Sequence, residues 1–137
     1  MARTAAVKVK WKAEPDEHDY PAAEAYLSLI AGPDVIARIV VELRAAPATH
    51  YKAKDILRAA RLDLLPRDNV HVASDLAAVR RRVRLSPVLL VRGDLTTGTE
   101  LQIADGYHRV CASYYVDENT DIPCRIVSAT SPRRVSR

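Results

Sequence analysis

The pattern of hydrophobic and polar positions predicts short strands and amphipathic helices along the whole chain. Near the start, Val7, Val9 and Trp11 alternate with lysines, and this period of two is typical of a strand. Lysine side chains discourage further strand pairing, so we expect this strand at the edge of a sheet. Two stretches with apolar residues at helical spacing follow, separated by Gly32-Pro33. They predict two helices that form an antiparallel hairpin.

Prolines mark the start of the first predicted helix and the end of the second. Pro21 opens the first helix, since proline is favoured at the first helical position, and Ala46-Pro47 stops the second. Neither helix carries a catalytic arrangement of side chains, so we expect a packing role for both. The core-facing residues predicted from the spacing are Ala22, Ala25, Tyr26, Leu29 and Ile30 in the first helix and Val35, Ile36, Ile39, Val40 and Leu43 in the second.

The segment after the hairpin, residues 50–64, fits two predictions. Its apolar spacing fits a helix, but its first five residues also fit a strand with lysines on one face. A polar loop follows. Apolar residues between 72 and 79 then predict a helix with Ser74 or Asp75 near its start and an arginine cluster at its end.

Three strands are predicted in the remainder of the chain. Residues 87–91 are apolar almost throughout, which indicates a central strand buried on both faces. The alternating stretch 101–104 follows a turn over 94–98, so these two strands form a hairpin. A last strand is expected over 122–127.

The most informative stretch begins where the second strand of this hairpin ends. The strand runs into Asp105-Gly106, where glycine tolerates the positive φ that other residues resist. A helix predicted over 107–116 follows, and its first turn carries His108 and Arg109. Backbone N–H groups, the helix dipole and the guanidinium group would together attract an anion to this turn.

A plain structural interpretation of the same turn is also open. Asp105 would then serve as the N-cap of the helix, and Tyr107, His108 and Arg109 would form a solvated first turn. The two interpretations differ in where Arg109 points, which is either towards a bound anion or into a pair with an acidic side chain of the protein.

Composition narrows the class of protein. The 137 residues suit a domain with its own core, and 48% hydrophobic with 28% charged residues is ordinary for a globular chain. No apolar run approaches the length of a membrane span, and lysines interrupt the N-terminal stretch where a signal peptide would be apolar. We therefore expect a cytoplasmic protein without a membrane partner. Cys111 and Cys124 lack metal-ligand spacing, and a disulfide between them is not expected in a reducing compartment.

The net charge of +4 permits a phosphate-bearing partner without requiring one. The excess is concentrated at two places, one near the end of the third predicted helix and one in the tail after residue 128. Positive charge at the end of a helix is favourable to its dipole, which is one explanation of the first cluster. Contact with nucleic acid is the other. The first cluster consists of Arg80, Arg81, Arg82 and Arg84.

The order of elements from residue 51 to 127 resembles the superfamily of ParB N-terminal domains and sulfiredoxins, which also includes kinases of free serine. The most specific part is the turn IADGYHR together with the strand that opens with Ile122-Pro123. The resemblance implies an α+β fold with a small mixed sheet and flanking helices, here preceded by an N-terminal strand and a helical hairpin. It implies an N-terminal region (1–49) packed on the core, a ParB/sulfiredoxin-like domain (50–128) and a basic tail (129–137).

In these relatives the corresponding turn contacts the phosphates of ATP, ADP or CTP. Gly106, His108 and Arg109 match that turn, and Arg58 matches the arginine of the sulfiredoxin Asp-Ile-x-Arg segment. Tyr107 stands where sulfiredoxins carry their catalytic cysteine and ParB proteins a glutamate, so reduction of a sulfinic acid is not expected. The Asp-Gly start of the turn is most similar to the serine-kinase branch.

The resemblance and the chemistry of the turn together predict a nucleotide-binding domain that hydrolyses or transfers a phosphoryl group. The expected ligand is a nucleoside triphosphate or diphosphate with Mg²⁺. The alternative is a non-catalytic DNA-binding or regulatory module that uses the arginine cluster. The candidate nucleotide-binding residues are Arg58, Gly106, Tyr107, His108 and Arg109, the candidate catalytic residues are Asp105 and His108, and the candidate Mg²⁺ ligands are Asp55 and Asp105.

Overall fold

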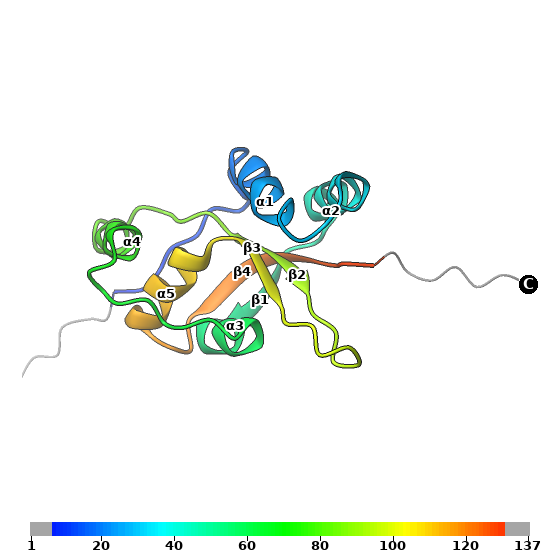
Figure 1. The fold of residues 1–137 in the computed structure, drawn as a ribbon. Coiled ribbons are helices and arrows are strands. Elements are labelled where there is room, and N and C mark those ends of the chain that lie inside the picture. Colours follow the sequence, from blue (N-terminus) through cyan, green and yellow to red (C-terminus); the bar gives the residue numbers. More distant parts are fainter. Residues whose placement is uncertain (1–6, 131–137) are drawn as a thin grey trace, which may run out of the picture.

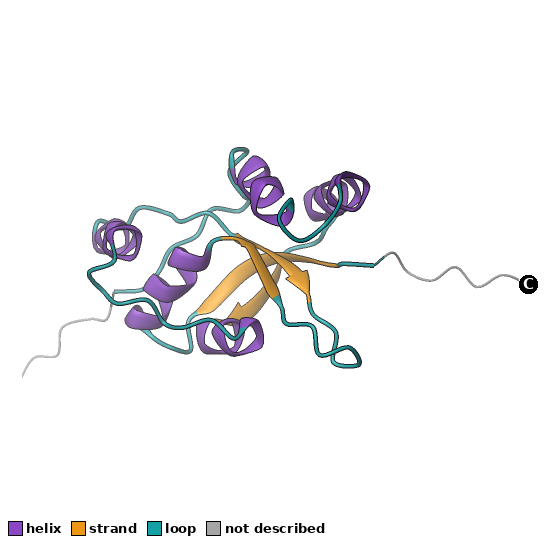
Figure 2. Cartoon of the chain, viewed as in Figure 1, coloured by secondary structure: helices purple, strands orange, loops and turns teal. Residues whose placement is uncertain are grey.

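A four-stranded mixed sheet with helices on both faces forms the centre of the protein (Figure 1; Figure 2). The computed structural model describes residues 7–130. The strand order is β1-β4-β2-β3, with β2 parallel to β4 and the other two pairs antiparallel. This confirms the expected α+β class and the mixed sheet. The elements are α1 (Asp19–Leu27), α2 (Pro33–Ala45), β1 (Thr49–Lys52), α3 (Ala53–Ala60), α4 (Val70–Arg80), β2 (Val88–Arg92), β3 (Gln102–Asp105), α5 (Tyr107–Val116) and β4 (Asp121–Ser128).

β2 is the strand that joins the two cores of the protein. Successive side chains of a strand point to opposite faces of the sheet. Val88 and Leu90 lie in the core beneath α3, α4 and α5, whereas Leu89 and Val91 lie in the core beneath α1 and α2. All four side chains are buried. The prediction of a central strand buried on both faces is therefore confirmed.

The buried face of α1 differs from the predicted one. Tyr20, Ala23 and Leu27 are buried, and the prediction is wrong at every residue it named, since all of these are exposed: Ala22, Ala25, Tyr26, Leu29 and Ile30. The prediction took the apolar residues up to Ile30 as one helix. The helix instead begins before Pro21 and ends at Leu27, so the last two apolar residues lie in the connection to α2.

The predicted face of α2 is confirmed apart from Val35, which is exposed. Pro33 occupies the first turn of α2, where its fixed φ suits a helix and its missing N–H is not needed. At the other end, Ala46 adopts an extended conformation because the following proline disfavours a helical one. α1 and α2 lie beside each other on one face of the sheet, with α1 packed on β3 and α2 on β4 (Figure 1).

The two alternatives for residues 50–64 are both present, one after the other. β1 ends at Lys52 and α3 begins at Ala53. The predicted start of the next helix is wrong, because α4 begins at Val70. Asn69 is its N-cap, and the Asn69 side chain accepts hydrogen bonds from the backbone N–H groups of His71 and Val72.

The N-terminal edge strand is also not formed as predicted. Within residues 7–130, the segment before α1 makes a single bridge, in which Trp11 pairs in parallel with Leu85. Trp11 packs on the core beneath α5, while the neighbouring lysines are exposed. The alternating pattern therefore identified the side chains that face inwards, but the segment pairs with the residues after α4 and not with the sheet.

The remaining predictions hold closely. β2 and β3 form the expected hairpin, α5 covers residues 107–116 as predicted, and β4 extends the last predicted strand by one residue at each end. Cys111 and Cys124 are buried and free. None of the helices within residues 7–130 has the length and apolar content that crossing a bilayer requires. The basic residues from 131 onwards lie outside the described part of the chain.

Candidate functional site

The site is built on the turn between β3 and α5. β3 ends at Asp105, and Gly106 adopts a φ of +114°, which side chains other than hydrogen rarely permit. A Cβ at position 106 would lie 2.5 Å from Cγ1 of the buried Val88. The predicted need for a glycine at this turn is therefore confirmed on both conformational and steric grounds.

At this turn, the amino terminus of α5 presents backbone donors that have no acceptor among residues 7–130. The first helical hydrogen bond joins Val110 N–H to the Gly106 carbonyl, and the N–H groups of Tyr107, His108 and Arg109 precede it. The N-cap is Gly106, which offers no capping side chain. The interpretation of Asp105 as the N-cap is wrong, because its carboxylate bonds Arg109 instead.

Arg109 is held from one side by groups of the protein itself. Nη2 donates to Asp105 Oδ2 at 2.7 Å and to the Pro87 carbonyl at 3.4 Å, and it lies 3.8 Å from Asp19 Oδ2. Nε is buried and has no hydrogen-bond partner among the described residues. The guanidinium is thus held through a single nitrogen. Its pair with Asp105 is the arrangement that the plain structural interpretation of the turn predicts.

Asp19 brings α1 into this site, and nothing in the sequence pattern singled it out. The residue is only 2% exposed, although it is acidic and begins α1. The hydroxyl of Ser86 donates a hydrogen bond to its carboxylate, and the backbone N–H of Asp16 donates another at 3.2 Å. The buried Asp19 and the half-buried Asp105 therefore face the same guanidinium from two elements.

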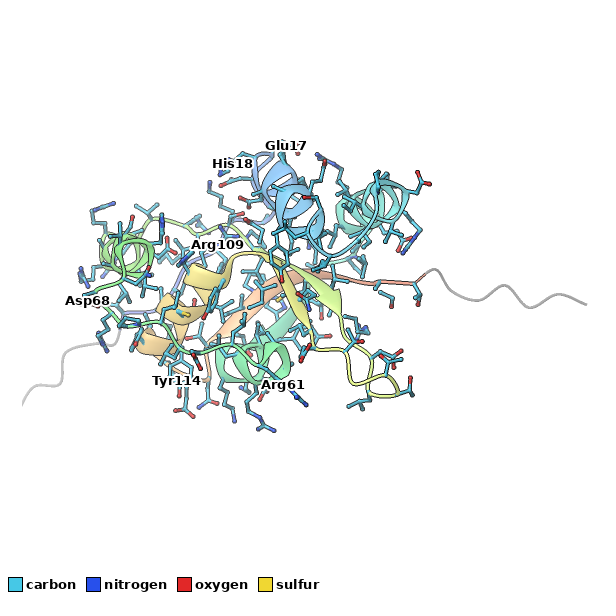
Figure 3. All side chains as sticks on the ribbon, in the orientation of Figure 1. Glu17, His18, Arg61, Asp68, Arg109 and Tyr114 are labelled. Atoms are coloured by element: carbon cyan, nitrogen blue, oxygen red, sulfur yellow. The ribbon has the colours of Figure 1, made fainter. Side chains whose placement is uncertain are left out.

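The opposite side of the site comes from α4. The rings of His71 and His108 lie 4.7 Å apart between centroids, and Tyr107 stacks on His108 at 5.7 Å. Burial lowers the pKa of His108, and the neighbouring His71 lowers it further, so the ring is neutral at pH 7. In Figure 3, Arg109 lies at the start of α5 between α1 and α4.

Two carboxylates at the site are disfavoured in their charged form. Burial raises the pKa of Asp75 on α4, although the nearby Arg109 and His108 oppose this shift. Burial also raises the pKa of Asp105, against the effect of its ion pair with Arg109, and the neighbouring Asp19 raises it further. The sequence suggested Asp75 only as a helix start. Its distance along α4 from the N-cap Asn69 is the signal that could have placed it inside the helix, facing this site.

Tyr107 has a role in the fold that the sequence did not indicate. Its hydroxyl donates to the Asp63 carbonyl at 2.5 Å, and the Tyr115 hydroxyl donates to the Leu65 carbonyl at 2.7 Å. These two bonds tie the loop between α3 and α4 to α5. The Tyr107 ring, in contrast to its hydroxyl, remains next to His108.

Arg58 and Asp55 lie elsewhere. Both line a cavity of about 440 Å³ between α3 and the connection from β2 to β3, together with Arg61 and Arg92. None of residues 105–109 belongs to the lining of this cavity. The structure thus brings Asp105, Gly106, Tyr107, His108 and Arg109 together with Asp19, His71 and Asp75, and it separates them from Arg58 and Asp55.

One group of side chains within residues 7–130 has the spacing of a metal site. Asp16, His18 and Asp19 each place one ligand atom within 4.8 Å of the others. Two of these carboxylates already have partners, since Asp16 bonds Lys12 at 2.7 Å and Asp19 accepts from Ser86. The group is therefore explained by internal contacts.

Comparison of the chain with protein-family models, with curated proteins and with solved structures gave no match. The chemistry of the site follows from its own geometry. That geometry comprises an oriented guanidinium, a helix amino terminus, a neutral histidine and carboxylates whose protons are held more tightly than usual.

Proposed function

We propose that the turn at Gly106 binds the phosphate group of a nucleotide together with Mg²⁺. The observation that carries this proposal is the position of Arg109, whose guanidinium is fixed at the amino terminus of α5 with its Nε left without an acceptor. A buried donor without a partner costs about 1–3 kcal/mol, and more when it is charged. An anion that accepts from this nitrogen would recover that cost.

The contact between Asp105 and Arg109 supports this role, because it orients the guanidinium in advance. A side chain held by a second residue loses less conformational freedom when a ligand binds. Nη2 serves the protein, and among the described residues neither Nη1 nor Nε has an acceptor. Nε is covered by protein atoms, so a ligand reaches it only after neighbouring atoms move.

His108 and the carboxylates would take the other roles. A neutral imidazole donates one hydrogen bond and accepts another, which suits His108 to a phosphate oxygen. Mg²⁺ prefers carboxylate, water and phosphate oxygens, and the carboxylates of Asp105 and Asp75 are the groups nearest to this role. Arg58 and Asp55 line the other cavity, and the proposal gives them no part in this site.

The same groups fit phosphoryl transfer or hydrolysis. That chemistry needs charge neutralisation and positioning more than covalent catalysis. Arg109 and Mg²⁺ would neutralise the developing charge, and His108 or Asp105 would hold the proton of the attacking hydroxyl or water. The likeness of the turn to those of ParB proteins, sulfiredoxins and serine kinases supports a nucleotide as the ligand.

Calorimetric titration with ATP, ADP and CTP in the presence of Mg²⁺ tests the proposal. We expect saturable binding of at least one of the three by the wild-type chain. Arg109→Ala should abolish it, and Arg109→Lys should weaken it about tenfold or more because an ammonium group lacks the planar fork. Arg92→Gln, which removes an exposed arginine from the other cavity, is the matched control and should bind like the wild type.

Two outcomes would count against the proposal in different ways. Absence of binding for all three nucleotides would remove the function. Binding that persists in Arg109→Ala would keep a nucleotide ligand but move its site away from Gly106.

A further inference from the structure

Two basic segments that are distant in the sequence lie side by side in the fold. The backbone N–H of Lys12 donates to the Leu85 carbonyl at 2.8 Å, and the Leu85 N–H donates to the Lys10 carbonyl at 2.8 Å. The segment before α1 therefore runs parallel to the residues that follow α4, as the blue and green traces of Figure 1 allow the reader to follow.

The pairing turns the charged side chains of both segments outwards. At the bridge, Leu85 is buried and Trp11 packs on the core, so their neighbours Lys10, Lys12 and Arg84 face solvent. Arg84 Nη1 also donates to the Trp11 carbonyl at 3.2 Å, which links the two segments once more. We define the basic surface as Lys8, Lys10, Lys12, Arg80, Arg81, Arg82 and Arg84, all of which are exposed.

Almost none of this positive charge is neutralised. Neither residues 7–13 nor residues 80–85 contain an acidic residue. Among the described residues, the only ion pair of the basic surface joins Lys12 to Asp16 at 2.7 Å. The dipole of α4 accounts for cations at its own end, such as Arg80, but not for lysines on a separate segment. An external polyanion explains both.

We infer that the basic surface binds the phosphate backbone of double-helical DNA without reading its sequence. The planar guanidinium group of arginine donates two parallel hydrogen bonds to phosphate oxygens, and four of the seven side chains are arginines. Single-stranded nucleic acid is held by exposed aromatic side chains, whereas Trp11, the one aromatic residue of residues 7–13 and 80–85, packs on the core. Duplex RNA is recognised across its minor groove through 2′-hydroxyl groups as well as phosphates, and tighter binding of an RNA duplex is an outcome of the test.

Other polyanions fit the surface less well. Binding to a membrane would require bulky apolar side chains beside the cations. An interface with an acidic protein would have an apolar centre. Within residues 7–13 and 80–85 the large hydrophobic residues that are exposed are Val7, at 42%, and Val83, at 47%, and two valines are too few for either kind of partner.

Fluorescence anisotropy of a labelled 20-base-pair DNA duplex, measured from 50 to 300 mM NaCl with the full chain, tests this inference. Each neutralised phosphate contributes about −0.9 to the slope of log K against log salt concentration, so the six cations that have no acidic partner among the described residues contribute about −5 to that slope. The double variant Lys8→Gln/Lys10→Gln and the double variant Arg80→Gln/Arg81→Gln should each make the slope less steep by about 2. The basic tail contributes equally to every variant.

The double variant Arg58→Gln/Arg92→Gln is the matched control, because it removes the same charge from exposed residues of the other cavity. Its slope should equal that of the wild type. The inference is overturned if the slope of this control becomes less steep by as much as the slopes of the other two variants. It is also overturned if the slope becomes less steep in the Arg80→Gln/Arg81→Gln variant alone, since the two segments would then not form one surface. Equal or tighter binding of an RNA duplex, single-stranded DNA or anionic vesicles would also overturn it.

Discussion

The turn at Gly106 and the basic surface both present arginines, but they treat the charge in opposite ways. At the turn, Arg109 is surrounded by Asp19, Asp75 and Asp105, and one of its nitrogens serves internal contacts. On the basic surface, six of the seven cations have no acidic partner among the described residues. The first arrangement fixes a single guanidinium, whereas the second leaves several charges mobile in solvent.

This difference separates two kinds of anion. A fixed donor in a partly desolvated site favours one small ligand of defined shape, and salt screens such a contact only weakly. The exposed cations of the basic surface favour a polyanion that releases bound counterions on binding, so its affinity falls steeply as the salt concentration rises. The fold places both in one short chain because α4 supplies His71 and Asp75 to the turn and ends at the arginines of the basic surface.

The largest change in the free energy of unfolding is expected from a side chain at position 106, which tests whether the turn can change its shape. Gly106→Ala would have to adopt a positive φ and would place its Cβ against Val88, so we expect the free energy of unfolding to fall by about 3 kcal/mol. Urea denaturation measures this change. Gly98→Ala, which also has a positive φ but open space around it, should lose less and serves as the control. Equal losses would show that sterics at Val88 contribute nothing.

A smaller effect is expected at the buried carboxylate of α1. Asp19→Ala leaves the Ser86 hydroxyl with only the Pro87 carbonyl as an acceptor, at 3.4 Å, and removes a neighbour of Arg109, so we predict a loss of about 2–3 kcal/mol in urea denaturation. Asp19→Asn retains an acceptor and should lose less than half as much. If both variants are as stable as the wild type, the contacts of Asp19 with Ser86 and Arg109 do not contribute to the free energy of unfolding.

Asp75→Asn should stabilise the protein by about 0.5–1 kcal/mol at pH 7. Burial raises the pKa of Asp75 above its unfolded value, so the folded chain binds the proton more tightly than the unfolded chain does. Ionisation therefore costs stability, and the cost grows as the pH rises from about 4 towards neutrality. The gain from Asp75→Asn should follow the same rise and vanish near pH 3.5. A gain independent of pH would refute this cause.

His108 predicts the opposite pH dependence. Burial and the neighbouring His71 lower its pKa below the unfolded value of about 6.5, so the unfolded chain binds more protons in that range. Stability should therefore fall as the pH drops from about 7 to 5, by a few tenths of a kcal/mol to about 1 kcal/mol. Thermal denaturation of His108→Gln across this range should show a shallower decline than the wild type.

The smallest effect is expected on the basic surface. Arg81→Gln should change the free energy of unfolding by less than about 0.5 kcal/mol, because its side chain is exposed and forms no ion pair with a described residue. A loss above about 1 kcal/mol would mean that the cluster serves the fold, and the contrast with the turn would disappear.

The sequence predicted the elements whose patterns are local. β2, β3, α5 and β4 follow from apolar runs, alternation and one Asp-Gly turn, and each signal lies within a few residues. The prediction for the buried face of α1 is wrong throughout, because Leu29 and Ile30 lie beyond the end of the helix. Counting them with the helix moved the predicted stripe off Ala23 and Leu27. No local pattern distinguishes a helix from its apolar connection.

The candidate site was predictable only in part for a related reason. Gly106, His108 and Arg109 are neighbours in the sequence, and their shared turn was visible. Asp19 and His71 reach the turn through the packing of α1 and α4, which no spacing in the sequence records. Arg58 was matched by resemblance alone, and the packing of α3 directs it to a different cavity.

Backbone and side-chain amide NMR during a titration with Mg²⁺ and ATP, ADP or CTP tests the central claim most directly. Binding at the turn predicts the largest shifts at the N–H groups of Gly106, His108 and Arg109, with the Arg109 Nε–H resonance moving downfield as it gains an acceptor. Shifts confined to residues 8–12 and 80–84, or to residues 92–100 at the other cavity, would contradict the claim that the turn holds the phosphate.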